Sequence, residues 1–230
     1  AWEEAEKRLE GTFHCNGQEH FYLESQAVLV VPGEEDQLHV HSSTQNTSEI
    51  QQVVAEALNL GFHQVVAVCK RMGGGFGGKE TQAAIPAVMA SLVAYHLKRP
   101  ARMIFTKDDD MKTTGKRHPF LIRYKSAFTS EGRITGLEVK LFSNGGAYAD
   151  LSTAIMERAM LHSDNAYFIP NVLIKGQVCR TNLPPNTALR GFGGPQGMAN
   201  IENIMQEMAI SLGKDAFEVR RLLSLIHISE

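Results

Sequence analysis

The spacing of apolar residues along the chain predicts several helices. Five are expected, over 50–58, 81–97, 151–162, 198–212 and from Asp215 onward. Gly61 and Gly213 follow two of these stretches and fit as helix stops. The run at 81–97 is apolar almost throughout, so we expect a buried helix in which Pro86 is tolerated near the first turns.

Short runs with β-branched residues or with alternating polarity predict the strands. These runs are 37–43, 64–70, 101–106, 120–128, 134–142 and 172–180. Residues 129–132 (Thr-Ser-Glu-Gly) have hairpin-turn chemistry and separate two of the runs. Because helices and strands are mixed along the whole length, we expect an α+β (mixed α/β) fold.

Composition excludes several classes of partner and site. The 230 residues carry a net charge of -2, which gives no electrostatic reason to bind nucleic acid or an anionic membrane. No run approaches the ~20 apolar residues that span a bilayer. The cysteines Cys15, Cys69 and Cys179 are far apart, so no iron–sulfur or zinc-ribbon site is expected and a reducing, cytoplasmic compartment is favoured. His39 and His41 lack a third ligand nearby and are interpreted as half-buried strand histidines.

A glycine-rich loop, 73–78, carries the first chemical signal. Five of its six residues are glycine, which usually marks backbone that bends sharply or approaches a ligand closely. It follows a predicted strand and satisfies GxGxxG, but the acidic residue that binds ribose ~20 positions later is missing. It also nearly satisfies the Walker pattern, but Glu80 stands where magnesium binding needs a hydroxyl. A turn without a ligand, or a loop that contacts some other cofactor through its N–H groups, stays open.

A second glycine loop, 186–197, precedes the helix at 198–212. Arg190 lies there in a setting that suits an anionic cofactor or substrate, although a surface arginine at a helix start is the plainer interpretation. Phe192 lies between glycines, where few neighbours can bury it, and this suits stacking on a flat ligand.

Seven segments resemble the molybdenum hydroxylases, and most closely their xanthine dehydrogenase branch of bacterial type. They are GQEHFYLES (17–25), SSTQN (42–46), KRMGGGFGGKET (70–81), TGKRHPF (114–120), IMERAM (155–160), HSDNAYFIPNV (162–172) and TNLPPNTALRGFGGPQG (181–197). The resemblance runs from about Gly11 to Arg221. It implies the first half of a molybdopterin-binding region, with residues 1–222 as a partial domain and 223–230 as a non-native tail.

The resemblance also implies roles for individual residues. Gln45, Gly75, Phe76, Gly77 and Arg190 match positions that contact the molybdenum–pterin cofactor, and no side chain is expected to bind molybdenum directly.

Four further positions match the substrate pocket of the branch. Glu80 and Arg158 match the acid and the arginine that bind purine, Phe192 matches a stacking phenylalanine, and Leu189 replaces a phenylalanine of animal enzymes. Taken alone, Glu80 and Arg158 are ordinary helix residues, a carboxylate at a helix N-terminus and an exposed arginine.

The activity that this resemblance implies is hydroxylation of hypoxanthine and xanthine to urate. The general-base glutamate, the [2Fe-2S] clusters and FAD are expected in the rest of an oligomeric enzyme, so this chain alone is expected to be inactive. Two alternatives stay open: an aldehyde or other N-heterocycle oxidoreductase of the same superfamily, and a non-catalytic nucleotide- or phosphate-binding module.

Overall fold

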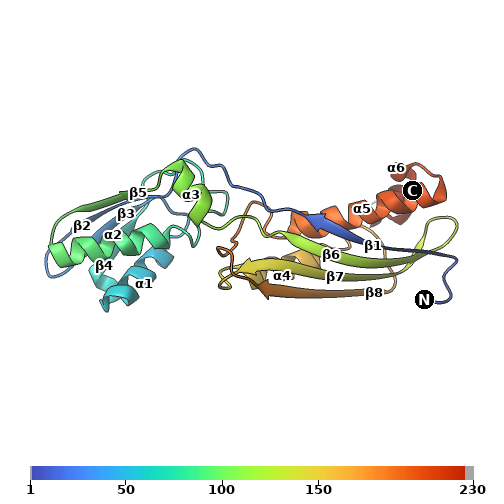
Figure 1. Cartoon of the computed structure of the whole chain (residues 1–230), viewed down its shortest axis with the longest axis horizontal. Helices are drawn as coiled ribbons and strands as arrows, with labels where there is room; N and C mark the ends of the chain where they lie inside the picture. Colours follow the sequence, from blue (N-terminus) through green and yellow to red (C-terminus); the bar gives the residue numbers. More distant parts are fainter. Residues whose placement is uncertain (1, 226–230) are drawn as a thin grey trace. The chain divides into compact units, whose positions relative to one another are not determined.

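The computed structural model describes residues 2–225 and divides into two compact units (Figure 1). The first unit contains the residues up to Gly17, residues 118–182 and the residues from Gly191 onward. The second unit contains residues 18–117 and 183–190. The short stretch 183–190 therefore packs with the second unit, although both of its flanks belong to the first.

The first unit is built on a four-stranded sheet of order β1-β6-β7-β8. The strands are β1 (Lys7–Cys15), β6 (Phe120–Phe128), β7 (Ile134–Gly146) and β8 (Val172–Arg180). The pairs β1–β6 and β6–β7 are antiparallel, which confirms the predicted hairpin around 129–132. The pair β7–β8 is parallel, and helix α4 (Ser152–Leu161) lies in the crossover that such a pair requires.

Apolar residues of the sheet and of three helices form the core of the first unit. Besides α4, these helices are α5 (Gly194–Leu212) and α6 (Ala216–Leu223). The buried strand residues Ile122 and Val139 belong to one cluster with Ile201, Met205 and Met208 of α5. The helical spacing of the α5 residues is the pattern that predicted this helix, and Gly213 ends it in the left-handed conformation, as predicted.

The second unit has its own sheet, of order β4-β3-β2-β5. Its strands are β2 (Ala27–Pro32), β3 (Leu38–Ser42), β4 (Val65–Val68) and β5 (Ala101–Ile104). Helices α1 (Thr47–Leu58) and α2 (Ala84–Leu97) share one core with the inward side chains of this sheet. His39 and His41 are partly buried on β3, which fits their interpretation as strand residues.

Two predictions about helices of the second unit were wrong in detail. Helix α2 is buried on one side only, because Met89, Val93 and Leu97 are exposed. Helix α1 ends at Leu58, and Asn59 caps it in the left-handed conformation two residues before the predicted stop at Gly61.

The α+β (mixed α/β) class is confirmed, but four elements were missed. They are β1, β2, the short 3-10 helix η1 (Phe62–Gln64) and α3 (Lys107–Thr113), with Thr106 capping the last of them through an N–H from Asp109. Of the predicted tail, Leu223 is buried in the first unit and the N–H of Leu225 donates to Ala166, whereas 226–230 lie outside the described residues. Within residues 2–225, no helix is both long and apolar enough to cross a membrane.

Candidate cofactor-binding site

Together with the adjoining Lys79, the first glycine loop comprises residues 73–79. It lies between β4 and α2 in the second unit. At its centre Phe76 has a φ of 53°, a left-handed conformation that costs a non-glycine residue roughly 1–2 kcal/mol. Its side chain remains 48% exposed instead of packing into the core. A strained and exposed phenylalanine is expected where a loop is shaped for a ligand.

Two glycines of this loop leave no room for a side chain. A Cβ on Gly77 would lie 2.7 Å from the carbonyl oxygen of Ala188, and φ at Gly77 is +101°. A Cβ on Gly75 would lie 2.5 Å from Oε1 of Gln45. Close packing against two neighbouring segments therefore explains these glycines within the protein itself.

Gln45 is bonded to the loop through one end of its amide. Its Oε1 accepts hydrogen bonds from the N–H groups of Gly77 (2.8 Å) and Lys79 (3.3 Å). Among residues 2–225, nothing accepts a hydrogen bond from its Nε2, and the residue is exposed. The amide therefore presents an oriented N–H donor to a ligand at the loop surface.

The second predicted loop is divided between the units, and its first part lies beside Phe76. The N–H of Arg190 donates to the carbonyl of Phe76 at 2.9 Å. The guanidinium of Arg117 donates to the carbonyls of Leu189 (3.5 Å) and Arg190 (2.8 Å). The side chain of Leu189 is buried, whereas that of Arg190 is exposed and has no ion pair within the described part of the chain. Arg190 can therefore offer an uncompensated positive charge to an anion.

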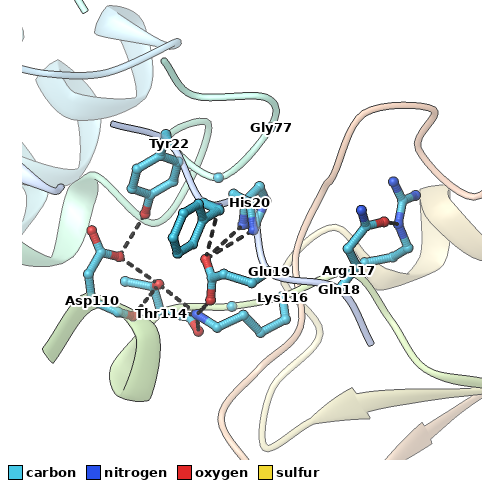
Figure 2. Close-up of polar contacts among 12 residues, drawn as sticks. Gln18, Glu19, His20, Tyr22, Gly77, Asp110, Thr114, Lys116 and Arg117 are labelled. Carbon is cyan, nitrogen blue, oxygen red and sulfur yellow. Dashed lines mark hydrogen bonds and ion pairs between the residues drawn. The ribbon is translucent and has the colours of Figure 1, made fainter. Parts of the chain in front are cut away.

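A polar network surrounds the segment 18–26 (Figure 2). This segment was recognised from the sequence as a motif, but its residues were given no role. Buried Asp110 accepts hydrogen bonds from the Tyr22 hydroxyl (2.6 Å), the N–H of Gln26 (2.8 Å) and the Thr114 hydroxyl (2.9 Å). Nε2 of Gln26 in turn donates to the carbonyl of Gly78 at 2.8 Å. Burial and the neighbouring carboxylate of Asp110 raise the pKa of Tyr22, so its hydroxyl remains protonated and donates.

His20 connects the same segment to the second loop. Its Nε2 lies 2.6 Å from the carbonyl oxygen of Ala188, and since a carbonyl can only accept, Nε2 carries the proton. Burial lowers the pKa of His20, so the ring is neutral at neutral pH. No isolated sequence pattern distinguishes His20, Tyr22 or Asp110 from ordinary core residues, because their roles depend on contacts distant in sequence.

Glu80 follows the first loop and precedes α2 by several residues. Helix α2 begins at Ala84, so Glu80 does not occupy the first helical turn. The N–H of Glu80 donates to the carbonyl of Gly77 at 3.4 Å, and the residue is partly exposed. The structure therefore does not support the alternative that Glu80 is simply a carboxylate in the first turn of a helix.

Arg158 and Phe192 belong to the first unit, together with the second half of the second loop. Phe192 also adopts a left-handed φ, of 49°, and is partly buried. The loop lies directly on α4: a Cβ on Gly193 would lie 2.1 Å from the carbonyl oxygen of Ile155, and one on Gly194 would lie 4.0 Å from Nε of Arg158. Arg158 is exposed on α4, so this surface presents a guanidinium close to the loop that carries Phe192.

The described residues contain no group of three or more His, Cys, Asp or Glu side chains arranged to hold a metal ion. What the second unit offers instead is a loop with a projecting aromatic ring, an oriented amide donor and an unpaired arginine. Such a set suits an anionic ligand that can accept hydrogen bonds.

Comparisons with known proteins agree with this chemistry. The model of the family described as "Molybdopterin cofactor-binding domain" matches residues 1–223. The chain is 48% identical to a xanthine dehydrogenase of Dictyostelium discoideum over 221 residues, and 50% identical to a xanthine dehydrogenase/oxidase of Mus musculus over 219 residues. These matches cover 96% and 95% of this chain but only 16% of each relative.

Solved structures with the same fold include an aldehyde oxidoreductase from Desulfovibrio gigas, with a TM-score of 0.89 and 28% identity. The match covers 97% of this chain and 24% of that chain. A CO dehydrogenase from Oligotropha carboxidovorans has a TM-score of 0.85 at 20% identity, over 97% of this chain and 28% of that chain, which supports the fold alone. The family match over nearly the whole length, together with the relatives at about 50% identity, shows that this chain belongs to the molybdopterin cofactor-binding domain family.

Proposed function

We propose that this chain is part of a xanthine dehydrogenase-type enzyme that hydroxylates hypoxanthine and xanthine to urate. The main support is the identity of about 50% with xanthine dehydrogenases over nearly the whole chain, which spans 16% of their length. The rest of the enzyme is proposed to contribute the general-base glutamate, the [2Fe-2S] clusters and FAD. A cytoplasmic location and an oligomeric state belong to the same proposal.

The residues of the first glycine loop fit a molybdenum–pterin cofactor. When bound, the cofactor supplies the two-electron chemistry of the hydroxylation. On this proposal Nε2 of Gln45 donates a hydrogen bond to it, while the ring of Phe76 and the backbone at Gly75 and Gly77 line it. The exposed charge of Arg190 neutralises part of its negative charge. The fit is supported by the Gln45 amide, whose Oε1 is held by two N–H groups while its Nε2 has no acceptor among residues 2–225.

Glu80 and Arg158 are proposed to bind the purine. A purine carries N–H and C=O groups on opposite sides, so a carboxylate and a guanidinium can satisfy both. Arg158 would also stabilise the negative charge that develops on the ring during attack. Phe192 is proposed to stack on the ring, and Leu189, whose side chain is buried, is proposed to influence which substrate is accepted.

The test is urate formation from xanthine by the full-length enzyme, loaded with molybdenum and expressed with its partners. We expect Glu80→Ala and Arg158→Ala each to lower kcat/KM by about 100-fold or more. Glu56→Ala and Arg133→Ala, at exposed positions of the second and first units, should leave turnover unchanged. A molybdenum-loaded enzyme that ignores xanthine but oxidises aldehydes or another heterocycle would overturn the purine assignment and keep the family.

A further inference from the structure

The two ends of the first glycine loop meet at one carboxylate oxygen. Oε2 of Glu24 accepts hydrogen bonds from the N–H of Gly73 (2.8 Å), from Nζ of Lys79 (3.1 Å) and from the hydroxyl of Ser43 (2.6 Å). The N–H of Glu24 also donates to the carbonyl of Gly73, at 3.1 Å. The first and last residues of the loop are thus joined to the same side chain.

Lys79 is the member of this cluster that requires an explanation. Its side chain is fully buried, with a relative exposure of 0%, and it is among the largest fully buried side chains of the described chain. A buried ammonium group is costly unless it is paired and hydrogen-bonded. Glu24 and Ser43 accept its hydrogen bonds, and the ring of Tyr22 lies 4.8 Å from Nζ. Burial lowers the pKa of Lys79, and the carboxylate of Glu24 opposes that shift.

A loop so rich in glycine needs contacts that hold its two ends together. Five glycines between Gly73 and Gly78 give the unfolded loop a large conformational entropy, which must be overcome to hold one shape. Gln45 and Gln26 fix the middle of the loop through Gly77 and Gly78. Within residues 2–225, Glu24 alone connects the beginning of the loop to its end, because its contacts include both Gly73 and Lys79.

We infer that Glu24 is a positioning residue that, through the buried cation of Lys79, closes the first glycine loop and so holds Phe76 and Gln45 in the shape that receives the cofactor. The inference rests on the proposed cofactor role of this loop. Glu24 itself need not touch the cofactor. Its effect on a ligand passes through the backbone of residues 73–79.

The test is a double-mutant cycle with Glu24→Gln and Lys79→Met in the full-length enzyme. Hydrogen–deuterium exchange of a peptide covering 73–80 and molybdenum content are measured for each variant. Glu24→Gln leaves a buried cation without its counter-charge, so we expect the protection of 73–80 to fall at least about 10-fold and molybdenum content to fall with it. Lys79→Met removes that cation, so the double variant should recover most of both losses.

Asp36→Asn is the matched control, since Asp36 forms an exposed ion pair with Lys98 in the same unit at 2.5 Å. It should change neither quantity. Peptides from β2 and β3 report whether the second unit remains folded in every variant. The inference is supported if Glu24→Gln lowers the exchange protection of 73–80 locally and if adding Lys79→Met restores that protection. Unchanged exchange in Glu24→Gln, or an equal loss in β2 and β3, overturns it. Neither measurement uses xanthine, so a failure of the purine assignment would leave this result intact.

Discussion

The two glycine loops share a local sequence and a backbone shape, yet they are supported in different ways. Each contains Gly-Phe-Gly with the phenylalanine in the left-handed region, at φ values of 53° for Phe76 and 49° for Phe192. The first loop is held by hydrogen bonds to side chains, among them Gln45, whose Oε1 accepts from the N–H of Gly77. The second lies on the backbone of α4, through Gly193 and Gly197. Both loops are closely packed, since a Cβ on Gly77 would also lie 2.7 Å from the carbonyl oxygen of Ala188. The first loop differs in its additional hydrogen bonds to side chains.

Replacing Gly193 with alanine should have the largest effect, because packing supports that loop. The new Cβ would lie 2.1 Å from the carbonyl oxygen of Ile155, in a buried part of α4, at a φ of +96°. Overpacking and the left-handed conformation together should lower the free energy of unfolding by about 3 kcal/mol or more. Urea denaturation of the full chain measures this. A loss below about 1 kcal/mol would show that α4 yields easily and that the loop is not fixed by packing.

Tyr22→Phe should have the next largest effect, through hydrogen bonding alone. The substitution keeps the ring but removes the hydroxyl that donates to Asp110 at 2.6 Å. A hydrogen bond to a charged group is worth roughly 1.5–3 kcal/mol, so we expect a loss of about 2 kcal/mol in urea denaturation. Tyr95→Phe, at a partly buried tyrosine of α2, is the control. Equal losses in both variants would contradict the role assigned to the network on segment 18–26.

The substitution Gln45→Glu tests the hydrogen bonds that support the first loop separately from the hydrogen bond that Gln45 is proposed to donate to a ligand. A carboxylate can still accept from Gly77 and Lys79, but it has no N–H to donate. We expect the unfolding free energy to change by less than about 0.5 kcal/mol, while kcat of the full-length enzyme falls about 10-fold. A variant with unchanged turnover would show that the amide donor of Gln45 faces no functional ligand.

His20→Gln should have the smallest effect, and one that depends on pH. Burial lowers the pKa of His20 in the folded chain, so the unfolded chain binds more protons just below the ordinary value of 6.5. Its stabilising contribution is therefore complete at neutral pH and declines as pH falls below about 6.5. Glutamine cannot titrate, so the variant should lose part of the decline in stability between pH 6.5 and 5. His63→Gln, at an exposed histidine, should keep that decline.

The sequence was sufficient for elements with strong periodicity. Helix α5 and the β6–β7 hairpin were predicted because their apolar residues recur at the spacing of one buried face. Strand β1 was missed because Lys7, Arg8 and Glu10 leave little apolar alternation in it. The burial of helix α2 was overestimated because its sequence is apolar all round, and composition does not reveal which side lacks a covering element.

The candidate site was predictable as motifs but not as a network. Gln45, Phe76 and Arg190 stand in recognisable segments of the sequence. In the second unit, the side chain of Gln45 and the backbone of Arg190 both contact the first loop. Glu24 and Asp110 could not be assigned, because Gly73 lies 49 residues from Glu24, and Gln26 and Tyr22 lie 84 and 88 residues from Asp110 along the chain. Long-range hydrogen bonds of this kind leave no periodic signal in a single sequence.

The measurement that tests the central claim most directly is the molybdenum and pterin content of the purified full-length enzyme with Gln45 and Arg190, which contact the first loop, altered. We predict that Gln45→Leu combined with Arg190→Ala lowers both contents severalfold, because the oriented amide and the unpaired charge are lost together. The Asp36→Asn enzyme should remain fully loaded. Unchanged molybdenum and pterin in the double variant would contradict the assignment of this loop as the place where the chain holds its cofactor.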